Sequence, residues 1–409
     1  MPDRTKKILF AIFFILFSIG MGYILYLVFF GKVQLPGIGV TNTVTTPPST
    51  LPNSNGGSPT TNIPSTSTGV LPIGTVVTTP TPAVAASRTQ LLRDGITQDV
   101  SMGSDKLGVR FYNPEDGRFY VINADGTTTA LSDKQFFNVG GVSWANQSNQ
   151  VILTFPDNSK IFYDFTAQKQ VDLPNFWSDF NFATDDQYVT AKSTGVDPSN
   201  RFLITTKADG TEAKAVEPLG DNGSLVTPAG TPDGQIIAYS ETGTPQPDGA
   251  QEILFVGQNH ENFRGLIAPG QGFMANWSPT GKELLFSVWS QSSNGDPDLW
   301  ITGGEPSTVG TDRRDLNIHT WVNLCAWGDD THIYCAVPQG LPADAGIDPE
   351  DYTGYPDDVY RIDLTAGTMT KVNTPDQVFP VNHPVVNADQ SKFIFTDATT
   401  GKLYSYDLK

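Results

Sequence analysis

The stretch that decides the fold is Trp277-Ser278-Pro279-Thr280-Gly281-Lys282-Glu283-Leu284-Leu285-Phe286, followed after a loop by Asp298-Leu299-Trp300-Ile301. Ser, Pro and Gly favour a tight turn, and the apolar residues on either side of them favour strands. The stretch therefore predicts a strand, a tight turn, a second strand, a loop and a third strand.

Weaker copies of this unit recur throughout residues 88–409. The other hairpins begin at Ser104, Asn149, Thr184, Thr231, Trp327 and Ala388. The third strands are expected at Arg118–Ile122, Lys160–Tyr163, Arg201–Ile204, Glu252–Phe255, Leu299–Ile301, Val359–Ile362 and Lys402–Tyr406. Dividing 322 residues by seven copies gives 46 residues per unit, which is the length of a propeller blade. The sequence predicts an all-β, seven-bladed β-propeller, with six or eight blades as alternatives.

Ring closure is also predicted. The last copy ends at its third strand, and Arg88–Leu92 has the pattern of a missing fourth strand. We expect this segment to pair with the C-terminal strand, to bury Leu91 and Leu92, and to leave no long open sheet edge.

The repeat resembles the TolB-like, WD-type β-propeller family of bacterial envelope proteins, whose core motif is Trp-Ser-Pro-Asp-Gly-Lys followed by an apolar strand. The copy at Trp277 matches best, with Thr280 in place of the Asp, and the copy at Thr231 keeps Pro-Asp-Gly without the Trp. The resemblance covers about 320 residues. It implies a propeller of the cell envelope, and it implies no single function, because propellers include binders, scaffolds and enzymes.

The N-terminus has the pattern of a membrane anchor. Ile8–Phe30 is a run of 23 residues without a charge, and as a helix it would span roughly 34 Å, enough to cross the hydrocarbon core. Arg4, Lys6 and Lys7 precede the run, so the positive-inside rule places the N-terminus in the cytoplasm. A cleaved signal peptide is the alternative. The expected domains are a cytoplasmic N-terminus (1–7), a transmembrane helix (8–30), a disordered linker (31–87) and the propeller (88–409).

Composition supports this organisation. Val33–Ser87 contains no Asp, Glu, Lys or Arg and is rich in Thr, Ser, Pro and Gly, a composition typical of an extended or disordered linker. The whole chain has 43 acidic and 25 basic residues, for a net charge of −18. This acidity argues against nucleic-acid binding, because a nucleic-acid partner requires a basic surface.

The two cysteines, Cys325 and Cys335, are expected on the first two strands of the sixth blade. A ladder in which Trp327 faces Ile333 places them opposite each other, where cross-strand Cβ atoms approach closely enough for a disulfide. An exported, oxidising location favours that bond. Two buried free thiols or a metal pair are the alternatives.

A polar ligand-binding site is predicted in the central funnel. His319 and His383 are expected near the innermost strands of adjacent blades, where Asp179, Asn181 and Asn323 could join them as ligand-binding residues. Exposed loop histidines are the alternative interpretation, and no metal site is assigned. The acidic insertion at 344–358 could bind calcium through carboxylate oxygens, or it could simply be a solvated loop or bind a partner.

The sequence contains no Gly-x-Ser-x-Gly elbow and no His-Glu-x-x-His motif, so no catalytic residue and no cofactor are assigned. We expect a membrane-anchored extracytoplasmic propeller, periplasmic or on the cell surface, that binds an envelope protein or a cell-surface glycan as a binding or scaffold module. The alternatives are a hydrolase or lyase with a polar funnel site, and a purely structural spacer.

Overall fold

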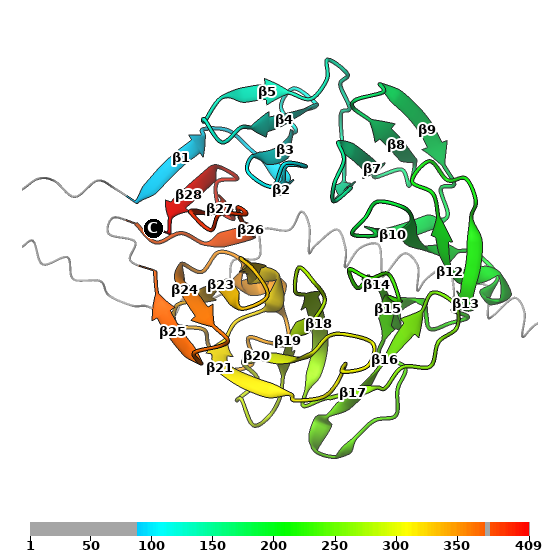
Figure 1. Ribbon diagram of the computed structural model, residues 1–409, viewed down its shortest axis with the longest axis vertical. Coiled ribbons are helices and arrows are strands. Elements are labelled where there is room, and N and C mark those ends of the chain that lie inside the picture. Colours follow the sequence, from blue (N-terminus) through cyan, green and yellow to red (C-terminus); the bar gives the residue numbers. More distant parts are fainter. Residues whose placement is uncertain (1–87, 373–376, 409) are drawn as a thin grey trace, which may run out of the picture. The chain divides into compact units, whose positions relative to one another are not determined.

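Seven four-stranded antiparallel sheets are arranged in a ring in the computed structural model, which describes residues 88–372 and 377–408 (Figure 1). The first strand of each blade lies toward the centre of the ring, and the fourth lies at its outside. This confirms the seven-bladed propeller, and all seven predicted third strands are present. The predicted transmembrane helix (8–30) and linker (31–87) lie outside the described residues. Within the described part of the chain, no helix has the length and apolarity needed to cross a membrane.

The strands follow one another around the ring, four to a blade (Figure 1). Blades one to three comprise β2 (Gln98–Met102), β3 (Val109–Asn113), β4 (Arg118–Ile122) and β5 (Thr128–Ala130); β6 (Gly141–Trp144), β7 (Gln150–Thr154), β8 (Lys160–Asp164) and β9 (Lys169–Leu173); and β10 (Trp177–Phe182), β11 (Val189–Thr194), β12 (Arg201–Thr206) and β13 (Lys214–Pro218). Blades four and five comprise β14 (Val226–Pro228), β15 (Ile236–Ser240), β16 (Gln251–Gly257) and β17 (Leu266–Ala268); and β18 (Gln271–Trp277), β19 (Glu283–Trp289), β20 (Pro297–Gly303) and β21 (Arg314–His319). Blades six and seven comprise β22 (Cys325–Trp327), β23 (His332–Pro338), β24 (Asp357–Asp363) and β25 (Thr368–Lys371); and β26 (Val381–Val386), β27 (Lys392–Asp397), β28 (Leu403–Asp407) and β1 (Thr89–Arg93).

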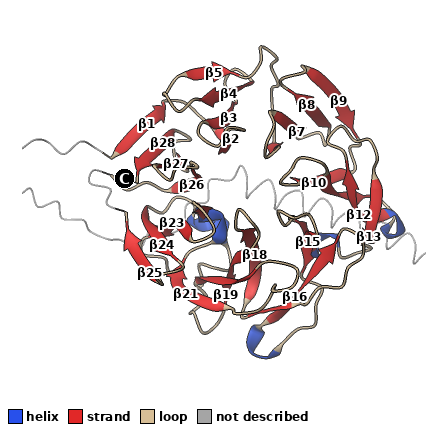
Figure 2. Cartoon of the chain, viewed as in Figure 1, coloured by secondary structure: helices blue, strands red, loops and turns tan. Residues whose placement is uncertain are grey.

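Helical structure is limited to five short 3-10 helices within the described residues (Figure 2). They are η1 (Pro198–Asn200), η2 (Gly223–Leu225), η3 (Pro247–Gly249), η4 (Val322–Leu324) and η5 (Pro349–Tyr352). All five lie in connections between strands, as expected from a sequence that lacks helical periodicity.

The two faces of the ring carry different connections. The links from the fourth strand of one blade to the first strand of the next lie on one face, together with the turns between second and third strands; we call this the upper face. The hairpin turns between first and second strands lie on the opposite, lower face.

Turn chemistry explains why the strands reverse where they do. At the turn between β4 and β5, the Asp125 carboxylate accepts a hydrogen bond from the Thr127 amide at 2.9 Å. Gly126 between them has φ +84°, a left-handed conformation that glycine adopts without steric cost. The Asp209-Gly210-Thr211 turn between β12 and β13 repeats this arrangement.

The core consists of apolar layers between neighbouring blades. Each of the seven blade junctions contains one cluster of buried side chains, including the one that joins blade seven to blade one. A blade therefore buries both of its faces, which explains why β3 is buried at every position. Buried apolar surface of this kind stabilises the folded state by about 25 cal/mol per Å².

The ring closes through β1, as the sequence predicts. Thr89 pairs with Tyr406 and Gln90 with Ser405, so the first described strand completes the last blade. The expectation that both leucines are buried is wrong for Leu91, which is 45% exposed. Only Leu92 packs against the layer between blades seven and one, because successive side chains of a strand point to opposite faces.

The departure of Thr280 from the repeat motif has a structural explanation. Its backbone amide and hydroxyl donate to the two carboxylate oxygens of Asp330, at 2.9 and 2.6 Å, in the hairpin turn of the next blade. Asp186 of blade three likewise accepts hydrogen bonds from Asn146 and Ser148 of blade two. On the lower face, aspartates therefore join the hairpin turns of neighbouring blades.

Candidate functional site

Four first strands contain a β-bulge near the upper face, and in three of them a residue other than glycine occupies it. These three residues are Asp99 in β2, Asp179 in β10 and His383 in β26, with φ of 50°, 54° and 48°. A left-handed conformation is unfavourable for residues other than glycine, and bulges are common where a strand must redirect a side chain. Blade five has Gly272 at the corresponding place, with φ +68°.

His383 and Asp99 line one groove between blades seven and one. The groove has a volume of about 480 Å³ and is also lined by Gln98, Asn382 and Asp397. Burial raises the pKa of the Asp99 carboxyl, and the nearby His383 ring lowers it in part. A carboxyl and an imidazole at one groove can bind polar ligands or exchange protons.

Asp179 is engaged in an ion pair. Its carboxylate lies 2.7 Å from the ammonium of Lys192, whose side chain is 9% exposed, while Asp179 is 53% exposed. A buried ammonium requires a compensating charge, so this pair has a structural role in blade three.

Asn181 lies two residues further along the same strand and lines a different cavity. Its side-chain oxygen accepts a hydrogen bond from the Gly230 amide at 3.2 Å. It lines a cavity at the lower face rather than the upper groove.

His319 lies at the end of β21, the fourth strand of blade five. Its Nδ1 is 2.9 Å from the carboxylate of Asp298, at the start of the neighbouring strand β20. Burial raises the pKa of Asp298, and the His319 charge opposes that effect. Asn323 is exposed on η4. The chain thus places Asp179, His319, Asn323 and His383 toward the upper face, but His319 and Asp179 pair with partners in their own blades.

Asp99 was not singled out from the sequence. In a single strand it is an ordinary polar residue, and its proximity to His383 depends on ring closure. The bulge that distinguishes it has no signature in the local sequence.

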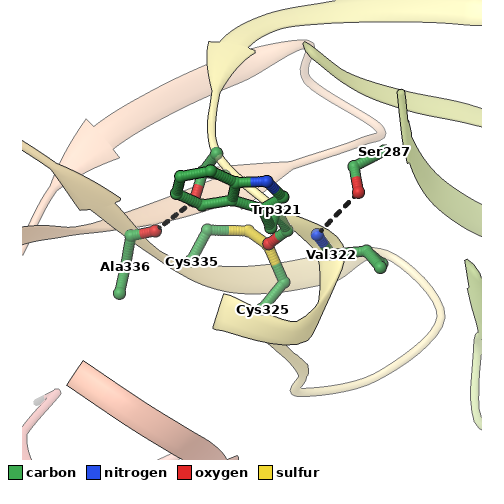
Figure 3. The surroundings of a disulfide bond; sticks show 7 residues. Ser287, Trp321, Val322, Cys325, Cys335 and Ala336 are labelled. Atoms are coloured by element: carbon green, nitrogen blue, oxygen red, sulfur yellow. Dashed lines mark hydrogen bonds between the residues drawn. A yellow bond between two sulfur atoms is a disulfide. The ribbon is translucent and has the colours of Figure 1, made fainter. Parts of the chain in front are cut away.

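The two cysteines form a disulfide in the layer between blades five and six (Figure 3). Cys325 faces Cys335 in the ladder of β22 and β23, the register that the sequence predicts. Two hydrogen bonds flank the bond: the Thr320 hydroxyl donates to the Ala336 carbonyl, and the Val322 amide donates to the hydroxyl of Ser287 in blade five. The disulfide thus lies where the connection between blades five and six enters β22.

The acidic insertion of blade six lies on the upper face between β23 and β24. Among the described residues, no group of three or more His, Cys, Asp and Glu side chains is arranged to hold a metal ion. Calcium binding by this insertion stays a prediction, which calorimetric titration of the protein with calcium would test.

Comparison with known proteins identifies the fold. No protein-family model matches the chain, and no curated protein matches its sequence. Among solved structures, an oligogalacturonate lyase in complex with manganese superposes with a TM-score of 0.54 and 15% identity, over 80% of this chain and 94% of that one. The β-propeller domain of Cps50 (Swd1) from Myceliophteria thermophila gives a TM-score of 0.53 and 11% identity, over 78% of this chain and 100% of that domain. At these identities the likeness shows the propeller fold alone.

Proposed function

We propose that the chain is a membrane-anchored, extracytoplasmic β-propeller that binds a basic envelope protein on its upper face. The observation that best supports this proposal is an ordered platform above blades five and six. The platform consists of the loop 290–296 between β19 and β20 and the insertion 339–356 between β23 and β24.

Backbone hydrogen bonds join the two loops of the platform. The Asp344 amide donates to the Asn294 carbonyl at 3.0 Å, and the Gly346 amide donates to the Gly295 carbonyl at 2.8 Å. Tyr352 stacks on buried Trp321, with ring centroids 6.4 Å apart. Loops ordered before binding lose less conformational entropy when a partner docks.

The surface chemistry of the platform indicates what kind of partner would fit. Ile347 is 46% exposed, and Tyr355 is half-buried beside Tyr352. Exposed acidic residues surround them: Asp344, Asp348, Glu350 and Asp351. Residues 339–356 contain no Lys, Arg or His. Aromatic and aliphatic anchors inside an acidic rim favour a protein with a basic contact surface.

An affinity pull-down from envelope extract tests this proposal. The bait is residues 88–409, which include every strand of the closed ring, compared with the double variant Ile347→Ala/Tyr355→Ala. Val196→Ala is the matched control, because Val196 is 98% exposed on an upper-face loop of blade three, outside the platform. We expect the unmodified bait to recover a basic protein. The double variant and a high-salt wash should both abolish its recovery, and the Val196→Ala bait should still recover it. Recovery of the same proteins by all baits, or of none, would reject the platform as a docking surface.

A second candidate is a hydrolase or lyase that uses the groove between blades seven and one. The specific observation in its favour is the Asp99 and His383 pair, with the raised pKa of Asp99. A carboxyl with a raised pKa is suited to general acid–base chemistry. The test is release of new chain ends from envelope polysaccharide by the purified protein. Activity that survives both Asp99→Asn and His383→Ala, or no activity, would exclude this groove as the catalytic site.

A further inference from the structure

The lower face contains a cavity at the axis of the ring. It has a volume of about 430 Å³, which lies within the range of small-ligand sites. Five consecutive blades contribute to its lining: Lys106 comes from blade one, Asn146 from blade two, Asn181 from blade three, Gly230 from blade four and Asn276 from blade five. Side chains from five blades of a ring can meet only near its axis, so we call this cavity the lower mouth.

Lys106 is the one charged residue among those that line the lower mouth. Its ammonium donates a hydrogen bond to the Asn146 carbonyl at 2.6 Å, and no ion pair within the described ranges includes it. An ammonium has three donors, so it can bind a further acceptor. The lining of the mouth therefore carries a single positive charge in a propeller whose sequence has an acidic excess.

The carboxylates nearest to Lys106 are occupied by backbone amides. Asp105 accepts from the amides of Leu107 and Gly108, both at 3.0 Å. Asp186 accepts from the amides of Asn146 and Gln147, at 2.6 and 2.8 Å. These contacts hold both acids in the turns, and neither lines the cavity. Burial lowers the pKa of Lys106, and the Asp186 charge still raises it in part.

Arg110 adds a second positive charge behind the lining. It is 1% exposed, and its guanidinium donates to the carbonyls of Ala145 and Ser148 in blade two. Its hydrogen bonds go to neutral carbonyls, while burial lowers the pKa of Arg110 and the nearby Asp186 carboxylate raises it in part. Of these charged groups only Lys106 lines the cavity, so its ammonium is where an anionic group of a ligand would bind.

The remaining polar side chains of the lining are uncharged: they are the amides of Asn146, Gln147, Asn181 and Asn276 and the hydroxyls of Thr184 and Ser278. The Asn276 side chain is exposed on β18, and no hydrogen bond of its amide is found within the described residues. Asn181 uses its oxygen for the Gly230 amide, which leaves its NH₂ group as a donor. Side-chain amides both donate and accept, as sugar hydroxyls do. Small apolar walls come from Ala229, Pro232, Ala275 and Pro279, which suit the hydrocarbon face of a sugar ring.

From these contacts we propose that the lower mouth binds a carboxylate-bearing sugar, with its carboxylate on Lys106 and its hydroxyls on Asn181 and Asn276. A lone lysine acts as a point charge suited to a single negative charge, whereas phosphate recognition more often uses the bidentate fork of arginine. This site is independent of the upper-face platform, so the failure of either proposal leaves the other intact.

Binding calorimetry on the full-length chain in a zwitterionic detergent tests the site. The probes are disaccharides that end in a uronic acid, each compared with its neutral counterpart, and inorganic phosphate. We expect the acidic disaccharides to bind more tightly than the neutral ones and than phosphate. A charge-assisted hydrogen bond contributes about 1.5–3 kcal/mol, so Lys106→Met should weaken binding by roughly 10- to 100-fold.

Two further variants make the test specific. Lys282→Met removes an exposed lysine from a lower-face turn that does not line the mouth, and should leave binding unchanged. Asn276→Ala should weaken acidic and neutral disaccharides alike, because it removes hydroxyl contacts only. Thermal melts confirm that each variant is folded. The proposal is overturned if no uronic-acid disaccharide binds, or if neutral disaccharides or phosphate bind as tightly as the acidic disaccharides. It is also overturned if Lys106→Met and Lys282→Met bind the acidic disaccharides with equal affinity.

Discussion

Asp357 should make the stability of the propeller depend on pH. It begins β24 and is 4% exposed. One carboxylate oxygen accepts a hydrogen bond from the Val381 amide of blade seven at 2.6 Å, and the other has no partner within the described residues. Burial raises the pKa of this carboxyl to about 7; the Val381 hydrogen bond lowers it in part, and the adjacent Asp358 adds to the rise.

The sign and size of the effect follow from linkage. The folded protein keeps a proton on Asp357 that the unfolded chain, with a pKa of 3.8, releases. The contribution of this group to stability is therefore complete below pH 3.8 and is lost as pH rises toward 7. At about 1.4 kcal/mol for each pH unit, the loss across that window amounts to roughly 4 kcal/mol.

Urea unfolding of residues 88–409 at pH 5 and pH 8 measures the effect. Asp357→Asn keeps an oxygen acceptor for Val381 and cannot ionise, so the variant should gain stability relative to wild type between pH 5 and pH 8. The expected relative gain is about 3 kcal/mol, because most of the titration lies in that interval. Asp358→Asn is the control, since it removes a neighbouring charge and leaves Asp357 able to titrate. The reasoning would be refuted if the free energy of unfolding of Asp357→Asn differed from that of wild type by the same amount at both pH values.

Three other predictions test closure, the disulfide and topology. Deleting residues 1–94 should lower the melting temperature markedly relative to deleting 1–87, and Leu92→Ala should cost about 1–3 kcal/mol while the exposed Leu91→Ala costs under about 0.5; equal melting of the two deletions would argue against closure by β1. Non-reducing mass analysis of the exported protein should find Cys325 and Cys335 joined, and replacing both with Ala should cost roughly 2–3 kcal/mol; two freely alkylated thiols would contradict this. Protease added to intact spheroplasts should remove the propeller, and protection until lysis would reverse the predicted orientation.

The sequence alone determined the parts of the fold that depend on neighbours along the chain. A hairpin of the Trp277–Phe286 type needs only apolar alternation and a turn residue, so seven copies could be recognised and counted. The closing strand β1 could be recognised because a blade with three strands leaves a free edge. The pairing of Cys325 with Cys335 could be predicted because both lie in a short two-stranded ladder around a single turn.

Tertiary structure decided the features that depend on contacts across the ring. The outer strand β25 is exposed at every position, and its sequence gives no apolar pattern to detect. Whether Leu91 or Leu92 enters the core depends on strand register against β28. Asp99 reaches His383 only because the ring closes, and Asn181 faces the lower mouth while Asp179, two residues away, pairs with Lys192. The polar sites of this propeller form where residues from different blades come together, and no local stretch of sequence indicates which residues these are.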